Sequence, residues 1–328
     1  MESSLSDIRT IGVLTSGGDA PGMNSCIRAV VRTAAAHHVR VVGVEHGFEG
    51  LIHGSFQLLG PRDVGGILQR GGTILGTGRS QDFLQPHYQR EAIREMNNEN
   101  IDALIVIGGE GSLHGAKVLQ DQGVRVLGIP GSIDNDVYGT DMCIGTDTAL
   151  NTIVDAIDKL RDTASSHNRA FFVETMGRSS GYLATLAGII SGAEMVLIPE
   201  EPTPLDEVAH TVEEAYRRGK THAIIVVAEG YTPKTTDIAQ ALLDMDIGYE
   251  PRVTILGHIQ RGGEPSAFDR LLSSRFGYQA VELLLNGESG SMVGLDGRDI
   301  VTVPLEDVVS KRPQLPVSYY EMANVLAQ

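Results

Sequence analysis

Two short apolar runs within residues 101–136 constrain the fold of this chain more than any other feature. The first covers 101–107 and is almost continuously apolar and β-branched, and the second covers 124–129. A strand that helices cover on both faces has this pattern, so both runs predict parallel strands of an α/β fold. Each run ends in a loop of glycine and acidic residues. Ligands of open α/β sheets bind at such strand ends.

The first loop, Gly108-Gly109-Glu110-Gly111, leads into a helix that Ser112 opens. Glycines let the main chain approach a ligand closely, and the free N–H groups at the start of a helix attract phosphate. A carboxylate in this cradle repels phosphate unless a divalent cation lies between them. Glu110 is therefore predicted to face a magnesium ion that lies between its carboxylate and the phosphate.

The second loop places two carboxylates, Asp134 and Asp136, two residues apart just past the end of a strand. One acid of such a pair accepts a proton from a substrate hydroxyl while the other supports it. An Asp-Asn-Asp sequence also occurs as a solvated turn, and that alternative stays open at this point. The neighbouring phosphate-binding loop favours a catalytic role for the two aspartates over a solvated turn.

Two further glycine loops extend the pattern. Residues 16–22 follow an apolar strand at 11–15 and precede a helix at 24–37. This second strand–loop–helix unit is suited to binding phosphate. A lone Gly-Gly-Asp sequence also serves as a tight turn, and that alternative stays open. Residues 70–79 contain four glycines between arginines. Arg79 is a candidate clamp for a nucleotide phosphate, because guanidinium matches phosphate oxygens bidentately.

Composition narrows the class of protein. A chain of 328 residues is long enough for two domains. Acidic residues outnumber basic ones by 42 to 26, and the formal net charge of −16 disfavours nucleic acid and anionic membrane as partners. Cys26 and Cys143 lie outside any CxxC or Cys/His cluster, which argues against zinc and a disulfide framework. With no apolar run of about 20 residues and no signal segment, we expect a cytoplasmic protein.

The rest of the chain continues to alternate strands and helices. Arg178 and Glu229 follow predicted strands, where sites are built. His258 stands near Arg261 and Arg252 and suggests an anion pocket, although a lone histidine is more often structural. Segment 231–250 has the weakest signal. Further strands are expected at 39–44, 170–174, 194–199, 222–228 and 253–256, and further helices at 62–69, 87–99, 148–163, 181–191, 206–218, 267–285 and 318–326.

Eight motifs together resemble the bacterial ATP-dependent 6-phosphofructokinases in order and approximate spacing: LTSGGDAPGMN, GGTILGTGR, IGGEGS, PGSIDND, SSHNR, ETMGRSSGY, AEG and LGHIQRGG. The resemblance spans nearly the whole chain. It implies two doubly wound three-layer α/β domains with mainly parallel sheets: a nucleotide-binding domain of 1–143 plus 259–308 and a sugar-phosphate-binding domain of 144–258 plus 309–328. The implied reaction is the glycolytic transfer of the γ-phosphate of MgATP to O1 of fructose 6-phosphate, giving fructose 1,6-bisphosphate.

The resemblance also implies residue roles. Asp134 matches the general base and Asp136 its supporting carboxylate, while Arg178 and the Gly18 N–H match groups that stabilise the transferring phosphoryl group. The implied ATP site comprises Gly18, Arg79, Gly109, Glu110, Gly111, Ser112 and Gly115, with Glu110 also at the metal. The implied substrate site comprises Ser132, Asp134, Asp136, Arg169, Met176, Gly177, Arg178, Glu229, Arg252, His258 and Arg261.

The family further implies a homotetramer, in which Arg169 and Arg252 enter the site of a neighbouring subunit. An effector site for ADP or phosphoenolpyruvate is implied by Arg28, Arg32, Arg161, Glu194, Arg218 and Lys220. The alternative for the Arg28 and Arg32 pair is a solvated helix face.

This chain departs from the family pattern at four positions. Glu110 stands where the family usually has Asp, and Ser132 where it usually has Thr. Ser80 stands where an aromatic residue is often found, so adenine packing is expected to differ. Pro61 replaces one basic residue of the effector site, and we expect weaker effector binding.

Three alternatives remain from the sequence. Pyrophosphate-dependent relatives carry Asp where Gly111 stands and Lys where Gly131 stands, and these side chains would fill space that ATP needs, so glycine at both favours ATP. A non-catalytic nucleotide or sugar-phosphate sensor would have little reason to keep Asp134, Asp136 and Glu110 together. A NAD or lipid kinase would share only the GG-acid-G loop.

Overall fold

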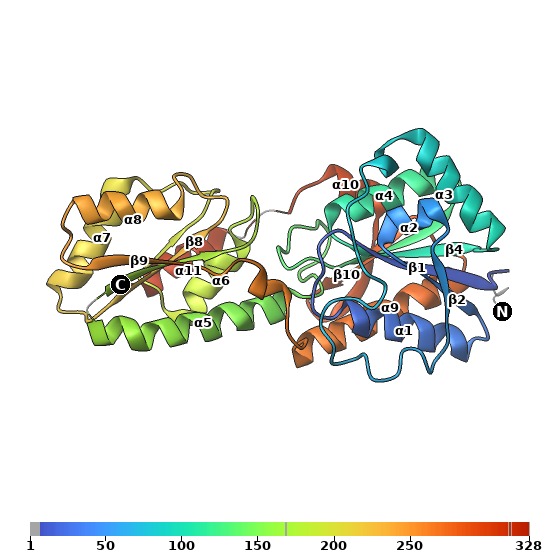
Figure 1. The fold of residues 1–328 in the computed structure, drawn as a ribbon, viewed down its shortest axis with the longest axis horizontal. Helices are drawn as coiled ribbons and strands as arrows, with labels where there is room; N and C mark the ends of the chain where they lie inside the picture. Colours follow the sequence, from blue (N-terminus) through green and yellow to red (C-terminus); the bar gives the residue numbers. More distant parts are fainter. Residues whose placement is uncertain (1–6, 168, 314, 316, 328) are drawn as a thin grey trace. The chain divides into compact units, whose positions relative to one another are not determined.

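The structure is a computed structural model that describes residues 7–167, 169–313, 315 and 317–327. The chain divides into two compact units (Figure 1). The first unit contains residues 1–148 and 261–313, and the second contains 149–260 and 314–328. Each unit is therefore built from segments that are far apart in the sequence.

The first unit contains a seven-stranded sheet in the order β11-β10-β5-β4-β1-β2-β3. The pairs β2–β3 and β10–β11 are antiparallel, and the other pairs are parallel. The chain winds outward from β1 in both directions, as expected for a doubly wound sheet. The strands are β1 (Thr10–Ser16), β2 (Arg40–Val44), β3 (Phe56–Leu59), β4 (Ala103–Gly108), β5 (Arg125–Pro130), β10 (Ser291–Asp296) and β11 (Asp299–Pro304).

Helices cover both faces of this sheet, so its central strands are buried on each side; every residue of β1 and β4 is buried. In Figure 1, α1 and α9 lie on one face and α2, α3, α4 and α10 on the other. The bounds are α1 (Met23–Ala36), α2 (Gly47–His53), α3 (Pro86–Asn98), α4 (Glu110–Asp121), α9 (Ala267–Leu285) and α10 (Leu305–Ser310), with a short 3-10 helix η1 (Asp82–Leu84).

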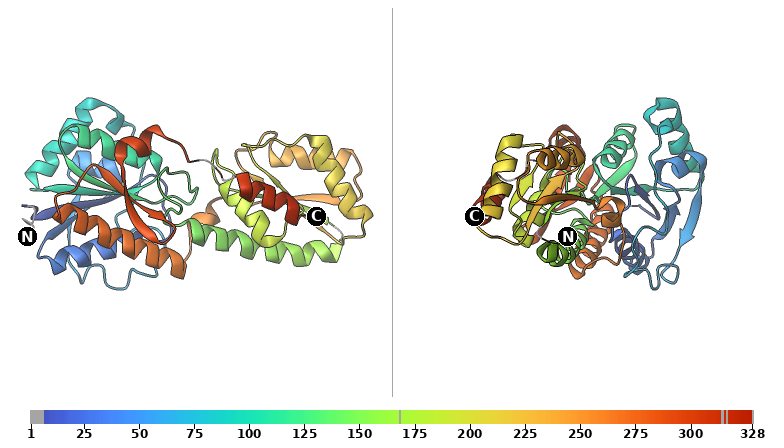
Figure 2. Two further views of the ribbon diagram at one scale, coloured as in Figure 1. Left: turned by 180° about the vertical axis from the view of Figure 1, so that it is seen from behind. Right: turned by 60° about the vertical axis from the view of Figure 1, so that its left-hand side comes forward.

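The second unit contains a smaller, fully parallel sheet in the order β7-β8-β6-β9. Its apolar core joins the sheet to α7 and α8, and α5, α6 and α11 belong to the opposite side, as the two views of Figure 2 show. The bounds are β6 (Arg169–Thr175), β7 (Met195–Leu197), β8 (Ala223–Ala228), β9 (Glu250–Ile255), α5 (Thr146–His167), α6 (Tyr182–Ser191), α7 (Leu205–Arg217), α8 (Thr235–Asp244), α11 (Val317–Leu326) and the 3-10 helix η2 (Gly257–Arg261).

The helix expected at residues 62–69 is wrong. Residues 61–66 form turns, and Gly66 adopts a left-handed φ of 73°. Two adjacent glycines, Gly65 and Gly66, make a helix there costly. The elements α2, β3, α8, β11 and α10 were not predicted from the sequence, whereas the long helices and the parallel strands β1, β2 and β4 to β9 were. In the part of the chain that the structure describes, no helix is both long and apolar enough to cross a membrane.

Candidate active site

Three strands of the first unit end side by side. Ser16, Gly108 and Pro130 are the last residues of β1, β4 and β5, and they are paired in register across the sheet. The Gly131 N–H donates to the Gly108 carbonyl at 3.0 Å. A Cβ added at Gly109 would lie 3.6 Å from the Cβ of Ser132. The glycine loop after β4 and the acidic loop after β5 are therefore neighbours.

The acidic loop is held by its own serine. The Ser132 hydroxyl donates to Oδ1 of Asp136 at 2.9 Å and accepts from the Asp134 N–H at 3.3 Å. Asp134 is 1% exposed, and Asn135 between the two acids adopts a left-handed φ of 50°. The Asp136 carboxylate and the Asp134 main chain are thus held in one turn at the edge of the sheet, with Asp134 buried and Asp136 partly exposed.

The same loop is joined to the segment before α5 by side chains that the sequence analysis did not identify. The Asn135 carboxamide accepts from the Cys143 N–H at 2.7 Å and donates to the Asp141 carbonyl at 3.0 Å. The Thr146 hydroxyl donates to the Ser132 carbonyl at 2.9 Å. These bonds couple the acidic loop to the first turn of α5.

Asp269, in the first turn of α9, holds the segment at the start of α5. Its fully buried carboxylate accepts from the Gly145 N–H at 2.8 Å and from both the N–H and the hydroxyl of Thr148, at 2.8 and 2.5 Å. Burial raises the pKa of Asp269 to about 6, against the lowering effect of these bonds. No motif pointed to this residue, because its partners lie more than 100 residues away.

The loop after β1 approaches Arg261, the last residue of η2. Arg261 donates through Nη1 to the Asp19 carbonyl at 3.2 Å, and its guanidinium occupies the space that a side chain at Gly18 would need. Gly18 is therefore required for this approach. The structure assigns Arg261 to the first unit, whereas Arg169, Arg252 and His258 belong to the second.

The glycine loop at 70–79 is bonded to the end of β1. The Gly17 N–H donates to the Gly78 carbonyl at 3.2 Å, and the Thr77 hydroxyl donates to the Gly17 carbonyl at 3.0 Å. Arg79 is exposed beside these contacts. Four loops of the predicted ATP and substrate sites, after β1, β4 and β5 and at 70–79, thus lie at one edge of the first unit's sheet.

The position after Arg79 has a structural role in this chain. The Ser80 hydroxyl donates to a carboxylate oxygen of Glu49 at 2.6 Å and accepts from the Phe83 N–H at 3.2 Å. The bond from Ser80 lowers the pKa of Glu49 below its usual value. Phe83 stacks on Phe48 with ring centroids 4.2 Å apart.

Gly115, a predicted ATP-site residue, packs against one of these rings. It is buried in α4, and a Cβ there would lie 2.6 Å from Cζ of Phe48. The absence of a side chain lets α4 approach α2 closely. Its contact in the structure is therefore with the apolar core of the first unit.

Glu110 opens α4 and forms an ion pair with Arg312. Among the described residues, no three His, Cys, Asp or Glu side chains gather into a group that would hold a metal by protein ligands alone. Magnesium usually takes one or two carboxylates and completes its shell with water and substrate phosphates, so a single carboxylate at a phosphate cradle fits it. Next to it, a Cβ at Gly111 would meet nothing within 4 Å, which leaves open space at the cradle.

The second unit brings another group together at the carboxyl end of its sheet. Oε1 of Glu229, just past β8, accepts from the Gly177 N–H at 3.2 Å and the Arg178 N–H at 2.7 Å, just past β6. The Met176 N–H donates to Gln260 at 3.2 Å. Arg178 adopts a left-handed φ of 52°, a conformation that costs a non-glycine residue about 1–3 kcal/mol and concentrates at functional sites.

The predicted phosphate arginines lie elsewhere in this unit. Arg169 is the first residue of β6, whereas Arg178 follows its last residue, so the length of the strand, about 20 Å for seven residues at about 3.3 Å each, separates their main chains. Arg252 lies on β9, next to β6, and His258 lies exposed in η2 beyond the end of β9. Arg169 and Arg252 therefore lie toward the start of β6 and β9, whereas Arg178 and His258 follow the ends of these strands.

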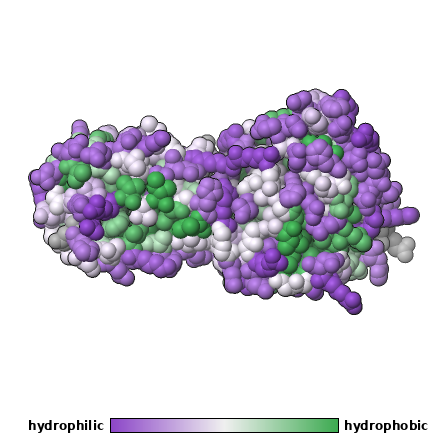
Figure 3. Space-filling view, viewed as in Figure 1, coloured by the Kyte–Doolittle hydropathy of each residue, from purple (hydrophilic) through white to green (hydrophobic). Residues whose placement is uncertain are grey.

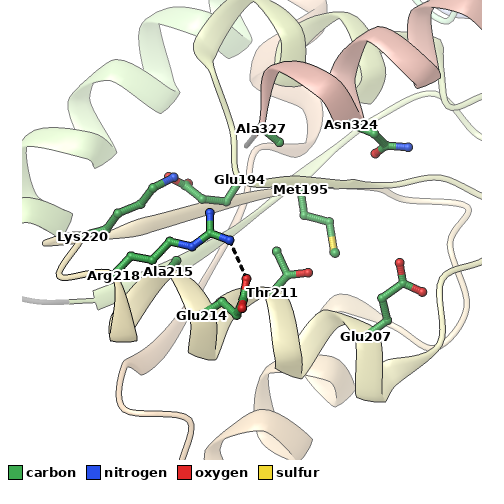
Figure 4. A pocket seen from close by; sticks show the side chains of 10 residues that line it. All are labelled: Glu194, Met195, Glu207, Thr211, Glu214, Ala215, Arg218, Lys220, Asn324 and Ala327. Atoms are coloured by element: carbon green, nitrogen blue, oxygen red, sulfur yellow. Dashed lines mark hydrogen bonds and ion pairs between the residues drawn. The ribbon is translucent and has the colours of Figure 1, made fainter.

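Three predicted effector residues line a cavity of about 440 Å³ in the second unit (Figure 4). Lys220 lies 3.3 Å from Glu194, and Glu194 also accepts from the Ile224 N–H at 2.6 Å. Arg218 points to Glu214, four residues earlier on α7, at 2.7 Å. The cavity therefore contains three glutamates, Glu194, Glu207 and Glu214, beside its two basic residues.

The other predicted effector residues lie outside that lining. Arg161, on α5, contacts His222 at 3.3 Å and the Ser191 carbonyl. Burial lowers the pKa of His222. Arg28 and Arg32 lie on α1 of the first unit, half-buried and exposed respectively, and Pro61 opens the turns at 61–66.

Comparison with known proteins identifies a single family. The family model described as Phosphofructokinase matches residues 10–284. ATP-dependent 6-phosphofructokinase of Thermotoga neapolitana is 50% identical over 321 residues, covering 98% of this chain and 100% of the relative. The protein of the same name from Halothermothrix orenii is 49% identical over 331 residues, with the same coverage.

Solved structures agree on the fold. Phosphofructokinase of Saccharomyces cerevisiae superposes with a TM-score of 0.86 at 36% identity, covering 97% of this chain and 48% of that chain. A pyrophosphate-dependent phosphofructokinase from Marinobacter aquaeolei superposes with a TM-score of 0.85 at 20% identity, covering 95% of this chain and 86% of that one. The latter likeness concerns the fold alone. The α/β architecture with mainly parallel sheets is thereby confirmed.

Proposed function

The chain belongs to the phosphofructokinase family, and on that premise we propose that it transfers the γ-phosphoryl group of ATP to O1 of fructose 6-phosphate, as a kinase of glycolysis. One observation carries the assignment of roles: the acidic loop with Asp134 and the glycine loop with Glu110 follow strands that end in register. A sugar hydroxyl at one loop and a nucleotide phosphate at the other would meet at that edge.

Direct in-line transfer needs little from the protein beyond position and charge. Asp134 accepts the proton of the attacking hydroxyl, and Asp136 supports the loop through Ser132, whose hydroxyl donates to the Asp136 carboxylate and accepts from the Asp134 main-chain N–H. The Gly18 N–H and the Arg178 guanidinium neutralise the charge that develops on the transferring group. Gly109, Gly111 and Ser112 hold the polyphosphate at the start of α4.

Glu110 would hold magnesium, which supplies charge neutralisation of the phosphates when bound. Glu110 must then exchange its partner, because Arg312 occupies the carboxylate in the structure. The side chain of Arg312 is 73% exposed, so little packing opposes its release.

The donor assignment favours ATP over pyrophosphate. Curated relatives at 50% and 49% identity are named for ATP. The open space at Gly111 supports the same choice, since a larger side chain there would fill it.

We further propose a homotetramer with shared sites. The separation of Arg169 from Arg178 along β6 supports it, because the phosphate pocket then needs arginines from a second copy. An exposed apolar surface also supports it: Figure 3 shows apolar side chains over α1 and α9, where Phe268 and Leu271 are 41% and 62% exposed. Such surfaces mark contact sites.

An effector site for ADP or phosphoenolpyruvate remains part of the proposal. The cavity with Glu194, Arg218 and Lys220 supports it. Pro61 and the pairing of Arg218 with Glu214 both reduce the positive charge available to an anion, and therefore predict weak effector binding.

We also propose a cytoplasmic location, which the free, buried cysteines Cys26 and Cys143 support.

The test is turnover of fructose 6-phosphate by the purified chain with MgATP, with pyrophosphate, and with neither. We expect ADP release with MgATP alone. Turnover only with pyrophosphate would show that the assignment of ATP as donor is wrong, and no turnover with either donor would favour the non-catalytic sensor.

Asp134→Ser should lower kcat by about 10²–10⁴-fold, with a smaller change in KM. Asp155→Ser, at an exposed aspartate on α5, is the matched control. A near-normal kcat in the Asp134 variant would remove it from the role of base.

A further inference from the structure

One carboxylate, Glu250, holds two arginines of the second unit. Arg169 and Glu250 are the first residues of β6 and β9, and they are paired in register across the parallel strands. Arg252 lies two residues further along β9, on the same face as Glu250, because successive side chains of a strand alternate. Oε2 of Glu250 accepts from Nε of Arg169 at 3.1 Å, and Oε1 contacts Nη2 of Arg252.

This arrangement contributes little to stability by itself. The side chains of Arg169, Arg252 and Glu250 are 28%, 46% and 48% exposed, and ion pairs at that exposure are worth about 0–1 kcal/mol. Its geometry is nevertheless specific, because each carboxylate oxygen serves a different arginine. The trio carries a net positive charge and faces solvent, which an anion can reach.

Both guanidiniums keep donors for a second partner. A guanidinium has five N–H donors; within the described part of the chain, Arg169 donates to Glu250 through its Nε and Arg252 through one terminal nitrogen. The free donors of two arginines suffice for the oxygens of one phosphate group. Without Glu250, two like charges would repel each other, and each long side chain would lose about 2 kcal/mol of rotamer entropy on binding an anion.

We propose that Glu250 is a positioning residue for the sugar phosphate: its carboxylate pre-arranges Arg169 and Arg252 as one phosphate-binding pair. The proposal rests on the assignment of these arginines to the 6-phosphate group under the proposed function. Glu250 touches neither the transferring phosphoryl group nor the sugar hydroxyl in this scheme, so it affects binding and leaves the chemical step alone.

The experiment is a fructose 6-phosphate titration at saturating MgATP with the full-length Glu250→Gln protein. Glutamine keeps the shape but loses the charge, and its amide N–H₂ would face one guanidinium. We expect KM to rise about tenfold, with kcat within about twofold of wild type, because binding and not transfer is impaired. The unchanged kcat also shows that the variant is folded. Glu213→Gln, which removes an equivalent partner from Arg217 on α7, should change neither constant.

Further variants distinguish a failure of the positioning role of Glu250 from a failure of the proposed function. Arg252→Ala should raise KM on its own, and Glu250→Gln added to it should raise KM by much less than tenfold, since its partner is gone. If Arg252→Ala raises KM and Glu250→Gln leaves it unchanged or lowers it, the positioning role is wrong and the proposed function stands. If neither variant changes KM, the 6-phosphate assignment fails, and the positioning role with it. Glu250→Asp, which keeps the charge on a shorter stem, should give an intermediate KM; a KM equal to that of Glu250→Gln would show that charge is not what matters.

Discussion

The Ser132 hydroxyl connects the Asp136 carboxylate to the main-chain N–H of Asp134. Ser132→Ala removes both bonds, each worth about 1 kcal/mol, so we expect kcat to fall by at most about thirtyfold, with little change in the KM for ATP. Ser132→Thr retains the hydroxyl and should keep most of the activity. Steady-state kinetics decide the matter. Wild-type kcat in the alanine variant would mean that Asp136 does not act through this serine.

Gly115 tests whether a residue of the implied ATP site acts by packing. Gly115→Ala places a methyl group 2.6 Å from the ring of Phe48, which is itself stacked on Phe83, and should lower the free energy of unfolding by about 1–3 kcal/mol. Chemical denaturation measures the change. Gly111→Ala in the same helix has open space and is the stability control. Equal stability of the two variants would contradict the packing role.

At the level of elements, Asp269 makes the junction between the start of α5 and the start of α9 depend on pH. Its folded pKa of about 6 lies above the ordinary value of 3.8, so folding favours the protonated form. Its contribution to stability is therefore largest below about pH 4 and is lost as pH rises through 6. The difference of about two units corresponds to about 3 kcal/mol.

Asp269→Asn abolishes this titration. Comparing the unfolding free energies of wild type and variant between pH 4 and pH 7, we expect wild type to lose about 3 kcal/mol relative to the variant as pH rises. Asp237→Asn, at the exposed first turn of α8, is the control for loss of a carboxylate elsewhere in the chain. A constant difference for Asp269→Asn would show that the carboxyl has the same pKa in both states.

The elements that the sequence predicted well are those with local signals. β1, β4, β5 and β8 are short, mostly apolar runs, buried on both faces apart from Arg125 at the start of β5, and each is recognisable from its own sequence. β3 is mostly half-exposed and exists because β2 lies beside it, and β11 depends in the same way on β10. The site follows the same rule. The Asp134 and Glu110 loops were visible as motifs, whereas the contacts of Glu250, Arg312 and Asp269 join residues distant in sequence and needed the fold.

At the level of the whole molecule, shared sites predict complementation between defective subunits. Asp134→Ser lacks the base, and Arg252→Ala lacks a charge that the proposal assigns to the neighbouring subunit's site. In a mixed tetramer, a site that combines Asp134 of one variant with Arg252 of the other has both native residues. Such sites would be about a quarter of all sites after random reassembly of equal amounts of the two variants. We expect activity at low fructose 6-phosphate to recover in the mixture beyond the sum of the separate variants. Absence of recovery after verified subunit exchange would place both residues in one chain's site.

The sheet of the first unit has a consequence for synthesis of the chain. β5 is complete at Pro130, but β10, its partner on one side, begins at Ser291. At a ribosomal rate of about 5–20 residues per second, the gap of roughly 160 residues takes on the order of ten seconds or more. During that time the nascent chain presents a bare, apolar strand edge. Yield in a cell will therefore depend on what shields this edge during translation, independently of how stable the finished protein is.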